Sequence, residues 1–115
     1  MFGIVFGIKC SYIILFVRIT FDPAKRAKTF EERGLDFIDA EHVFAGSTYT
    51  VRDERFTYPE AEGRFITVGF LAGRMVIIAW TPVPGTPIDE GRHVISMRKA
   101  NDREQARYRD RFEET

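Results

Sequence analysis

The sequence predicts an α+β domain with a short first strand and two N-terminal helices, then an antiparallel sheet of about four strands, then a C-terminal helix. Residues that start and stop helices bracket the segment from Asp22 to Gly34. Between positions 48 and 98, short runs of alternating apolar residues are separated by turn residues, which is typical of hairpin-connected strands. Beyond this region, Asn101 and Glu104 have the spacing of a helix capping box.

The first strand is expected at residues 17–21, where the side chains alternate. Asp22 can cap a helix, and Pro23 suits the first helical position because the N–H that proline lacks would have no intrahelical partner there. The helix is expected to run to about Arg33 and to end at Gly34, since glycine readily adopts the left-handed conformation of a C-terminal cap.

A second helix is expected from Asp36 to Gly46. Its apolar residues recur at spacings of three and four and so share one face: Phe37, Ala40, Val43 and Phe44. His42 points away from this face, so we expect it to be exposed rather than to act as a ligand.

Four strands are then expected, at residues 48–56, 64–71, 75–81 and 91–98. Ala72 and Gly73 form a tight turn between the second and third of these. The third strand is the most apolar, so we place it at the centre of the sheet. Residues 82–87 form a stiff loop because its prolines fix φ. The last strand, 91–98, is expected to close the sheet.

The segment 91–100 combines β-branched Val94 and Ile95 with three cationic side chains and a histidine. One interpretation is that it forms the floor and one wall of a phosphate-binding site. The other is a charged edge strand that only discourages aggregation. In a regular strand Arg92, Val94, Ser96 and Arg98 share a face, and His93 would need a bulge or the strand end to join them.

The length of 115 residues suits one domain with a single core. The 17 basic and 17 acidic side chains balance, so the protein has no overall basic field. The distribution is uneven, because residues 92–111 contain seven Arg or Lys and three Asp or Glu, which could form a local basic patch. The single cysteine, Cys10, excludes an intrachain disulfide, and zinc-type Cys/His spacing is missing.

The last helix is only weakly amphipathic. Tyr108 and Phe112 are four residues apart and could dock on the sheet. Arg103, Arg107 and Arg111 form a second line with the same spacing, where like charges repel. This line is either solvated surface or a contact for an anion or an acidic partner.

Residues 1–16 are apolar almost throughout, with Lys9 in the middle. A signal peptide should begin with positive charge, and a central lysine would cost a membrane helix roughly 2.5–3.5 kcal/mol. We expect instead that translation starts at Val17, read from a GUG codon, and that residues 1–16 are an over-extended start. A short membrane anchor is the alternative.

An ordered set of residues spans most of the chain from Val17 to Phe112. It comprises Phe21, Asp22, Pro23, Lys25, Arg33, Gly34, Leu35, Asp36, Phe37, Ala40, Val43, Phe44, Asp53, Arg64, Gly69, the run 94–100, Arg103, Glu104 and Tyr108. This set resembles the BrnT toxins of bacterial type II toxin–antitoxin operons. Glu32-Arg33 and His93 depart from the commonest family pattern at their positions.

The resemblance implies a RelE-like ribonuclease fold in one toxin domain at residues 17–115, with a growth-arresting RNA-cleaving activity in the cytoplasm. It also implies a BrnA-type antitoxin from the same operon as partner. The toxin would form either a dimer or a toxin–antitoxin heterotetramer. We expect no metal ion and no cofactor.

Metal-independent RNA cleavage uses the 2′-OH as nucleophile and needs a base, an acid and cations for the charge that develops on phosphorus. The hypothesis is that Arg64 and Arg98 bind the scissile phosphate and that His93 transfers a proton. The alternatives are that Arg64 forms a salt bridge to Asp53 or Glu62 and that His93 has no catalytic role. Arg92 would grip a neighbouring phosphate, and Lys25 and Arg103 would add substrate contacts. Glu60 is a weaker candidate for a catalytic role.

A non-catalytic binding module is the rival hypothesis. The basic strand and the last helix would then hold an acidic partner or a nucleic-acid backbone, and nothing would be cleaved.

Overall fold

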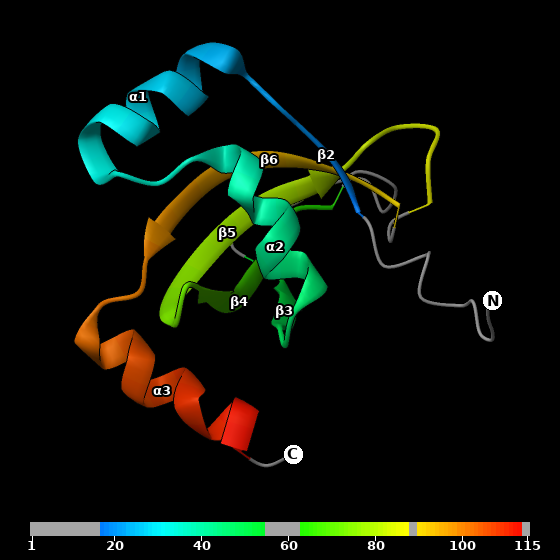
Figure 1. Cartoon of the computed structure of the whole chain (residues 1–115). Coiled ribbons are helices and arrows are strands. Elements are labelled where there is room, and N and C mark those ends of the chain that lie inside the picture. The colour runs from blue at the N-terminus through cyan, green and yellow to red at the C-terminus, as the bar shows by residue number, and fades with distance from the viewer. Residues whose placement is uncertain (1–16, 55–62, 88–89, 114–115) are drawn as a thin grey trace, which may run out of the picture.

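The computed structural model describes residues 17–54, 63–87 and 90–113. In chain order, the elements are β2 (Arg18–Phe21), α1 (Pro23–Arg33), the 3₁₀ turn η2 (Phe37–Asp39), α2 (Ala40–Ala45), β3 (Tyr49–Arg52), β4 (Phe65–Leu71), β5 (Arg74–Pro82), β6 (Gly91–Lys99) and α3 (Asp102–Glu113) (Figure 1). The expected over-extended start at 1–16 and the candidate Glu60 lie outside the described residues.

The strands form one five-stranded mixed sheet in the order β2-β6-β5-β4-β3. β5 is central, as its apolar sequence predicted. The four strands expected after the second helix are confirmed as the antiparallel set β3 to β6, but the sheet has a fifth strand, because β2 joins it parallel to β6, with Arg18 opposite Gly91. The first half of β6 is therefore interior and β6 does not close the sheet, whereas residues 95–99, with Arg98 and Lys99, have no register partner in β2.

The ends of α1 confirm the sequence signals. The Asp22 side chain accepts the Ala24 N–H at 2.9 Å and so caps the first turn. Gly34 has φ 71°, and its N–H donates to the Phe30 carbonyl at 3.0 Å, which ends the helix.

The predicted second helix is divided. Asp36 accepts the Ile38 N–H, so the chain starts with the tighter turn η2 before α2 begins at Ala40. The predicted apolar face is correct, because Phe37, Ala40 and Val43 are fully buried against the sheet. His42 is exposed, as expected.

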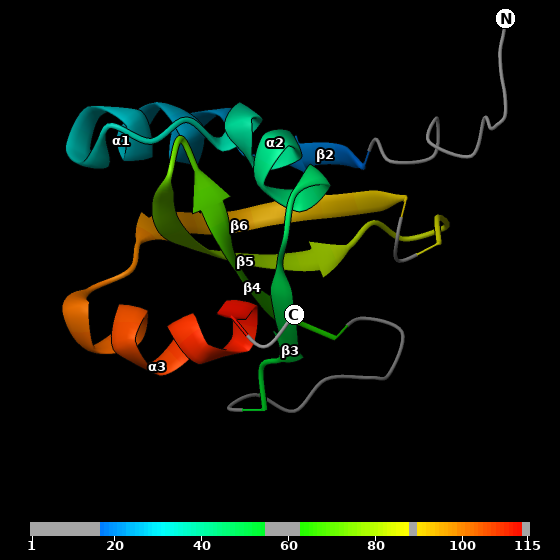
Figure 2. The same ribbon diagram turned by 60° about the horizontal axis from the view of Figure 1, so that its bottom comes forward.

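Helices cover both faces of the sheet. Figure 2 shows α1 and α2 on one side and α3 on the other. The larger core lies on the α2 side, where the buried Trp80 donates its indole N–H to Thr67 Oγ1 at 2.7 Å. The smaller core, on the α3 side, consists of Val68, Met75, Ile77 and Ala100, with Ile66, Tyr108 and Phe112 packed against it. Tyr108 and Phe112 thus dock as their spacing predicted.

Within the described part of the chain, no helix is long and apolar enough to cross a membrane.

Candidate functional site

A bulge in β6 decides which of its side chains face α3. Trp80 of β5 lies opposite Val94 and Ala79 lies opposite Ser96, so Ile95 is an extra residue in β6. The alternation of side chains shifts by one at this point. Consequently Val94 and Met97, three residues apart, both enter the core on the α2 side.

The bulge brings His93 onto the same face as Ser96 and Arg98, where β6 pairs with Thr81, Ala79 and Ile77 of β5. The expectation for a regular strand, in which Arg92, Ser96 and Arg98 share a face, was therefore wrong. The condition attached to His93, that it would need a bulge to join the others, is met.

A groove of about 560 Å³ lies between this face of the sheet and α3. Its floor is apolar and its rim carries charges of both signs. The lining residues are Val51, Arg52, Asp53, Glu54, Ile66, Ile77, Arg98, Glu104, Arg107 and Tyr108.

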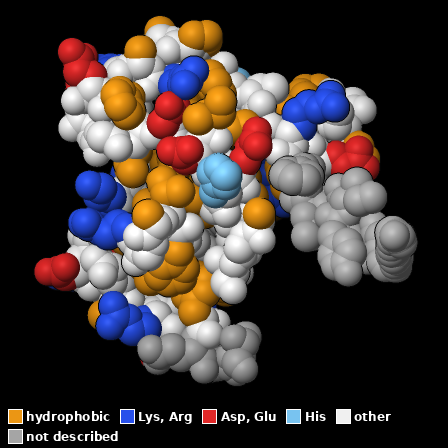
Figure 3. All heavy atoms as spheres, in the orientation of Figure 1, with side chains coloured by type: hydrophobic (Ala, Val, Ile, Leu, Met, Phe, Trp, Pro, Cys, Tyr) orange, Lys and Arg blue, Asp and Glu red, His pale blue; other side chains and the backbone are white. Residues whose placement is uncertain are grey.

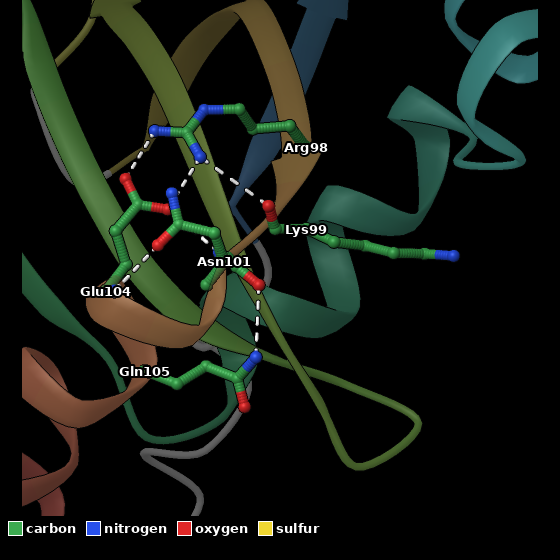
Figure 4. Close-up of polar contacts among 6 residues, drawn as sticks. Arg98, Lys99, Asn101, Glu104 and Gln105 are labelled. Carbon is green, nitrogen blue, oxygen red and sulfur yellow. Dashed lines mark hydrogen bonds and ion pairs between the residues drawn. The ribbon is translucent and has the colours of Figure 1, made fainter.

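Arg98 is held at the rim by a bidentate ion pair. Its Nη1 and Nη2 donate to Glu104 Oε1 and Oε2 at 2.8 and 2.7 Å (Figure 4). The hydrogen bonds from Arg98 and the backbone N–H of Asn101 hold the pKa of Glu104 down at about 2, against an ordinary 4.5. Asn101 and Glu104 also form the predicted capping box, with Asn101 Oδ1 accepting the Glu104 N–H at 2.8 Å.

Arg64 also has a carboxylate partner. Its Nε lies 3.7 Å from Oδ2 of Asp53, a carboxylate that is almost fully buried. The two residues are further joined through the backbone, because the Asp53 N–H donates to the Arg64 carbonyl at 2.8 Å. Asp53 therefore compensates the charge of Arg64 where β3 meets β4.

His93 is oriented by the parallel strand. Its Nδ1 lies 2.8 Å from Thr20 Oγ1, and Thr20 is its register partner in β2. The threonine thus fixes the position of one ring nitrogen of His93.

The strand register gives approximate backbone distances between Arg64, His93 and Arg98. Arg64 immediately precedes Phe65, which pairs with Trp80, so the row of Arg64 continues through Thr81 to His93. Two strand spacings, roughly 10 Å, separate the backbones of Arg64 and His93. Arg98 pairs with Ile77, four residues along β5 from Thr81, which is roughly 13 Å. The backbones of Arg64 and Arg98 are thus farther apart than those of Arg64 and His93.

The three predicted substrate contacts do not gather at this site. Arg92 is on the α2 side, where its guanidinium lies 4.2 Å from the centre of the Trp80 ring and 4.6 Å from that of Phe44. Lys25 is exposed on α1, across the sheet from the groove. Arg103 is exposed in the first turn of α3.

The candidate set did not include Asp53, Glu104, Arg107 and Tyr108, which line the groove. The sequence could have indicated Glu104, Arg107 and Tyr108, because these positions share one face of a helix. Among the residues that the structure describes, no three His, Cys, Asp or Glu side chains lie close enough to hold a metal ion.

Most of the chain matches one known protein family. The family model described as "Ribonuclease toxin, BrnT, of type II toxin-antitoxin system" matches residues 21–104. The matched segment runs from the last residue of β2 into the first turn of α3, so it contains Arg64, His93, Arg98 and Glu104. No curated protein and no solved structure matches the chain.

Proposed function

The chain belongs to the BrnT family of ribonuclease toxins of type II toxin–antitoxin systems, and we propose that it cleaves RNA without a metal ion, at the face of the sheet that α3 partly covers. In this proposal it acts in the cytoplasm, arrests growth and is neutralised by a BrnA-type antitoxin.

The observation that carries the proposal is the β6 bulge. It aligns His93 with Ser96 and Arg98 on the groove side and puts His93 in the same row as Arg64. A proton-transfer group and two guanidinium groups are the parts that cleavage through a 2′-OH requires.

His93 is the proposed proton-transfer group. The proposed tautomer has Nδ1–H donating to Thr20 Oγ1, 2.8 Å away, so that Nε2 has a lone pair that accepts the proton of the 2′-OH. The 2′ oxygen then attacks the adjacent phosphorus, the bond from phosphorus to the 5′ oxygen breaks, the 5′ oxygen takes a proton from solvent water, and a 2′,3′-cyclic phosphate remains.

Arg64 and Arg98 are proposed to hold successive phosphates. The planar guanidinium suits phosphate oxygens, and on Arg98 it is oriented by Glu104 and by the Lys99 carbonyl, which lies 3.5 Å from Nη1. Asp53 and Glu104 would fix the guanidinium planes against the groove. Arg103 would extend the basic surface of α3, whereas Lys25 and Arg92 would contact RNA only where it continues past an edge of the sheet.

The test is incubation of the purified chain with RNA in EDTA. Cleavage that leaves 2′,3′-cyclic phosphate ends is expected, slower by about 100-fold or more in His93→Gln. His42→Gln is the matched control, because His42 is exposed on α2, and it should cleave at the wild-type rate.

Arg64→Ala and Arg98→Ala should each abolish cleavage and growth arrest while the protein stays folded. Arg109→Ala, an exposed arginine on α3, should change neither. Full toxicity in both Arg64→Ala and Arg98→Ala would reject the assignment.

One observation favours a second candidate function, that of a non-catalytic binding module. Both arginines already face carboxylates, Asp53 and Glu104, and this lowers their capacity to take up a phosphate. On this view the same incubation would give intact RNA with retarded migration. A small neighbouring gene encoding a DNA-binding antitoxin would favour the toxin.

A further inference from the structure

The polarity of α1 is inverted relative to an ordinary surface helix. None of its eleven residues is buried. Its only half-buried side chains are polar, Arg26 and Thr29. A surface helix normally turns an apolar face to the core.

Polar contacts attach α1 to the rest of the molecule. Arg26 donates from Nε and Nη2 to the two carboxylate oxygens of Asp36, at 2.7 and 3.0 Å. Arg33 Nη1 donates to the Met97 carbonyl at 3.0 Å. These bonds orient the helix without burying its apolar residues.

The apolar residues of α1 lie at the surface. Phe30 is 59% exposed, and Pro23, Ala24 and Ala27 are exposed as well. A hollow lies on either side of Phe30, one lined by Ala24, Ala27, Lys28 and Glu31 and the other by Pro23, Arg26, Ala27 and Asp36. Figure 3 shows hydrophobic side chains at the surface in the upper part of the view, where α1 lies, next to charged ones.

A helix of this length whose apolar residues are uncovered gains little from its own packing. Isolated helices of fewer than about 12–15 residues are marginal in water. We propose that α1 is the docking surface for the antitoxin, which lays an apolar segment with acidic flanks against Phe30 and its two hollows. The proposal rests on the proposed toxin function for the identity of the partner.

Charge favours an acidic partner over a second copy of the chain. α1 has four basic and two acidic residues, so pairing two copies would bring two net positive helices together.

The test measures the affinity of the full-length chain for the antitoxin encoded beside its gene. Phe30→Ala should weaken binding by about 30-fold, because exposed aromatic anchors dominate interface energetics. Phe70→Ala is the matched control, since Phe70 is 39% exposed and packs edge-on against Phe112 on the α3 side. Wild-type affinity in Phe30→Ala, or equal weakening in both variants, would overturn the proposal.

A charge pair tests the chemistry of the partner. Lys28 and Glu31 line the same hollow, and Lys28→Glu should weaken binding several-fold, whereas Glu31→Lys should leave it unchanged or tighten it. The opposite pattern would reject an acidic partner. Sedimentation of the toxin alone would reveal a dimer that Phe30→Ala dissolves, and that result would assign the surface to a second copy.

RNA cleavage separates this proposal from the function on which it rests. Phe30→Ala should cleave RNA at the wild-type rate but need far more antitoxin for inhibition. If the wild-type chain cleaves no RNA, the ribonuclease proposal fails, while the binding measurements still report on α1. Hydrogen exchange should show α1 protected only in the complex, and protection in the isolated chain at low concentration would mean that the chain itself covers the helix.

Discussion

At the scale of single residues, Glu104 joins the end of β6 to the start of α3. One carboxylate oxygen accepts both the Asn101 N–H and Arg98 Nη1, and the other accepts Arg98 Nη2. All of these bonds favour the ionised carboxylate, so its pKa falls to about 2. The same side chain therefore caps the helix and positions the guanidinium at the groove.

Glu104→Gln should separate these two roles, because glutamine can still cap a helix but cannot form the ion pair. At neutral pH we expect the free energy of unfolding to fall by about 1–2 kcal/mol, a modest figure because Arg98 is 43% exposed and solvent screens the pair. Because folding lowers the pKa from 4.5 to about 2, the wild-type advantage should be complete above pH 4.5 and disappear as the pH falls toward 2.

Urea unfolding of both proteins across this pH range is the measurement. Glu41→Gln is the control, since Glu41 is exposed on α2, and its effect should be small at every pH. A Glu104→Gln deficit that persists unchanged at pH 2 would show that the ion pair is not its origin.

At the scale of elements, the turn between β4 and β5 determines the register of the hairpin, and the bulge in β6 determines the direction of its side chains. The β4–β5 turn has positive φ at both central residues, 51° at Ala72 and 79° at Gly73, as a type I′ turn requires. This turn keeps Leu71 opposite Arg74 and fixes the register of the hairpin. The β6 bulge at Ile95 then rotates one half of that strand relative to the other.

Ala72→Asn should stabilise the protein. Alanine pays for its positive φ through contact between Cβ and the backbone, whereas asparagine tolerates this conformation. We expect a gain of about 0.5–1 kcal/mol, which would raise the thermal midpoint by about 3 °C. Gly73→Ala should shift the midpoint in the opposite direction, and a lower midpoint in Ala72→Asn would contradict the turn assignment.

At the scale of the whole molecule, the two faces of the sheet differ in what covers them. The α2 side holds the larger core, and α2 approaches β4 closely at Gly69. The α3 side holds the groove. Since α1 lies across the sheet from α3, an antitoxin anchored on α1 would have to extend around an edge of the sheet to block the groove.

Gly69→Ala tests how tightly α2 is seated. A Cβ at this position would lie 2.6 Å from Cγ1 of the buried Val43 and 3.2 Å from Cγ2 of Thr48. Valine is stiff and this core is closely packed, so we expect a loss of about 1–3 kcal/mol in urea unfolding. Gly46→Ala, whose Cβ would meet nothing closer than 3.7 Å, should change stability far less. Equal effects would show that loss of glycine, not contact with Val43, is responsible.

The sequence by itself determined the features whose physical cause is local. The caps at Asp22 and Gly34, the capping box at Asn101 and the turn at Ala72 depend on side chains within a few residues, so their pattern predicted α1, α3 and the hairpin. The centrality of β5 followed in the same way from its apolar composition.

Only the tertiary structure decided which strand lies beside β6 and which way its side chains point. The pairing of β2 with β6 joins residues more than 70 positions apart, and the bulge at Ile95 arises from packing both Val94 and Met97 against the core. These are long-range packing effects, and no residue near His93 encodes them. Placing His93 on the same face as Arg98 therefore required the folded chain, whereas the salt bridge of Arg64 to Asp53 was one of the alternatives that the sequence offered.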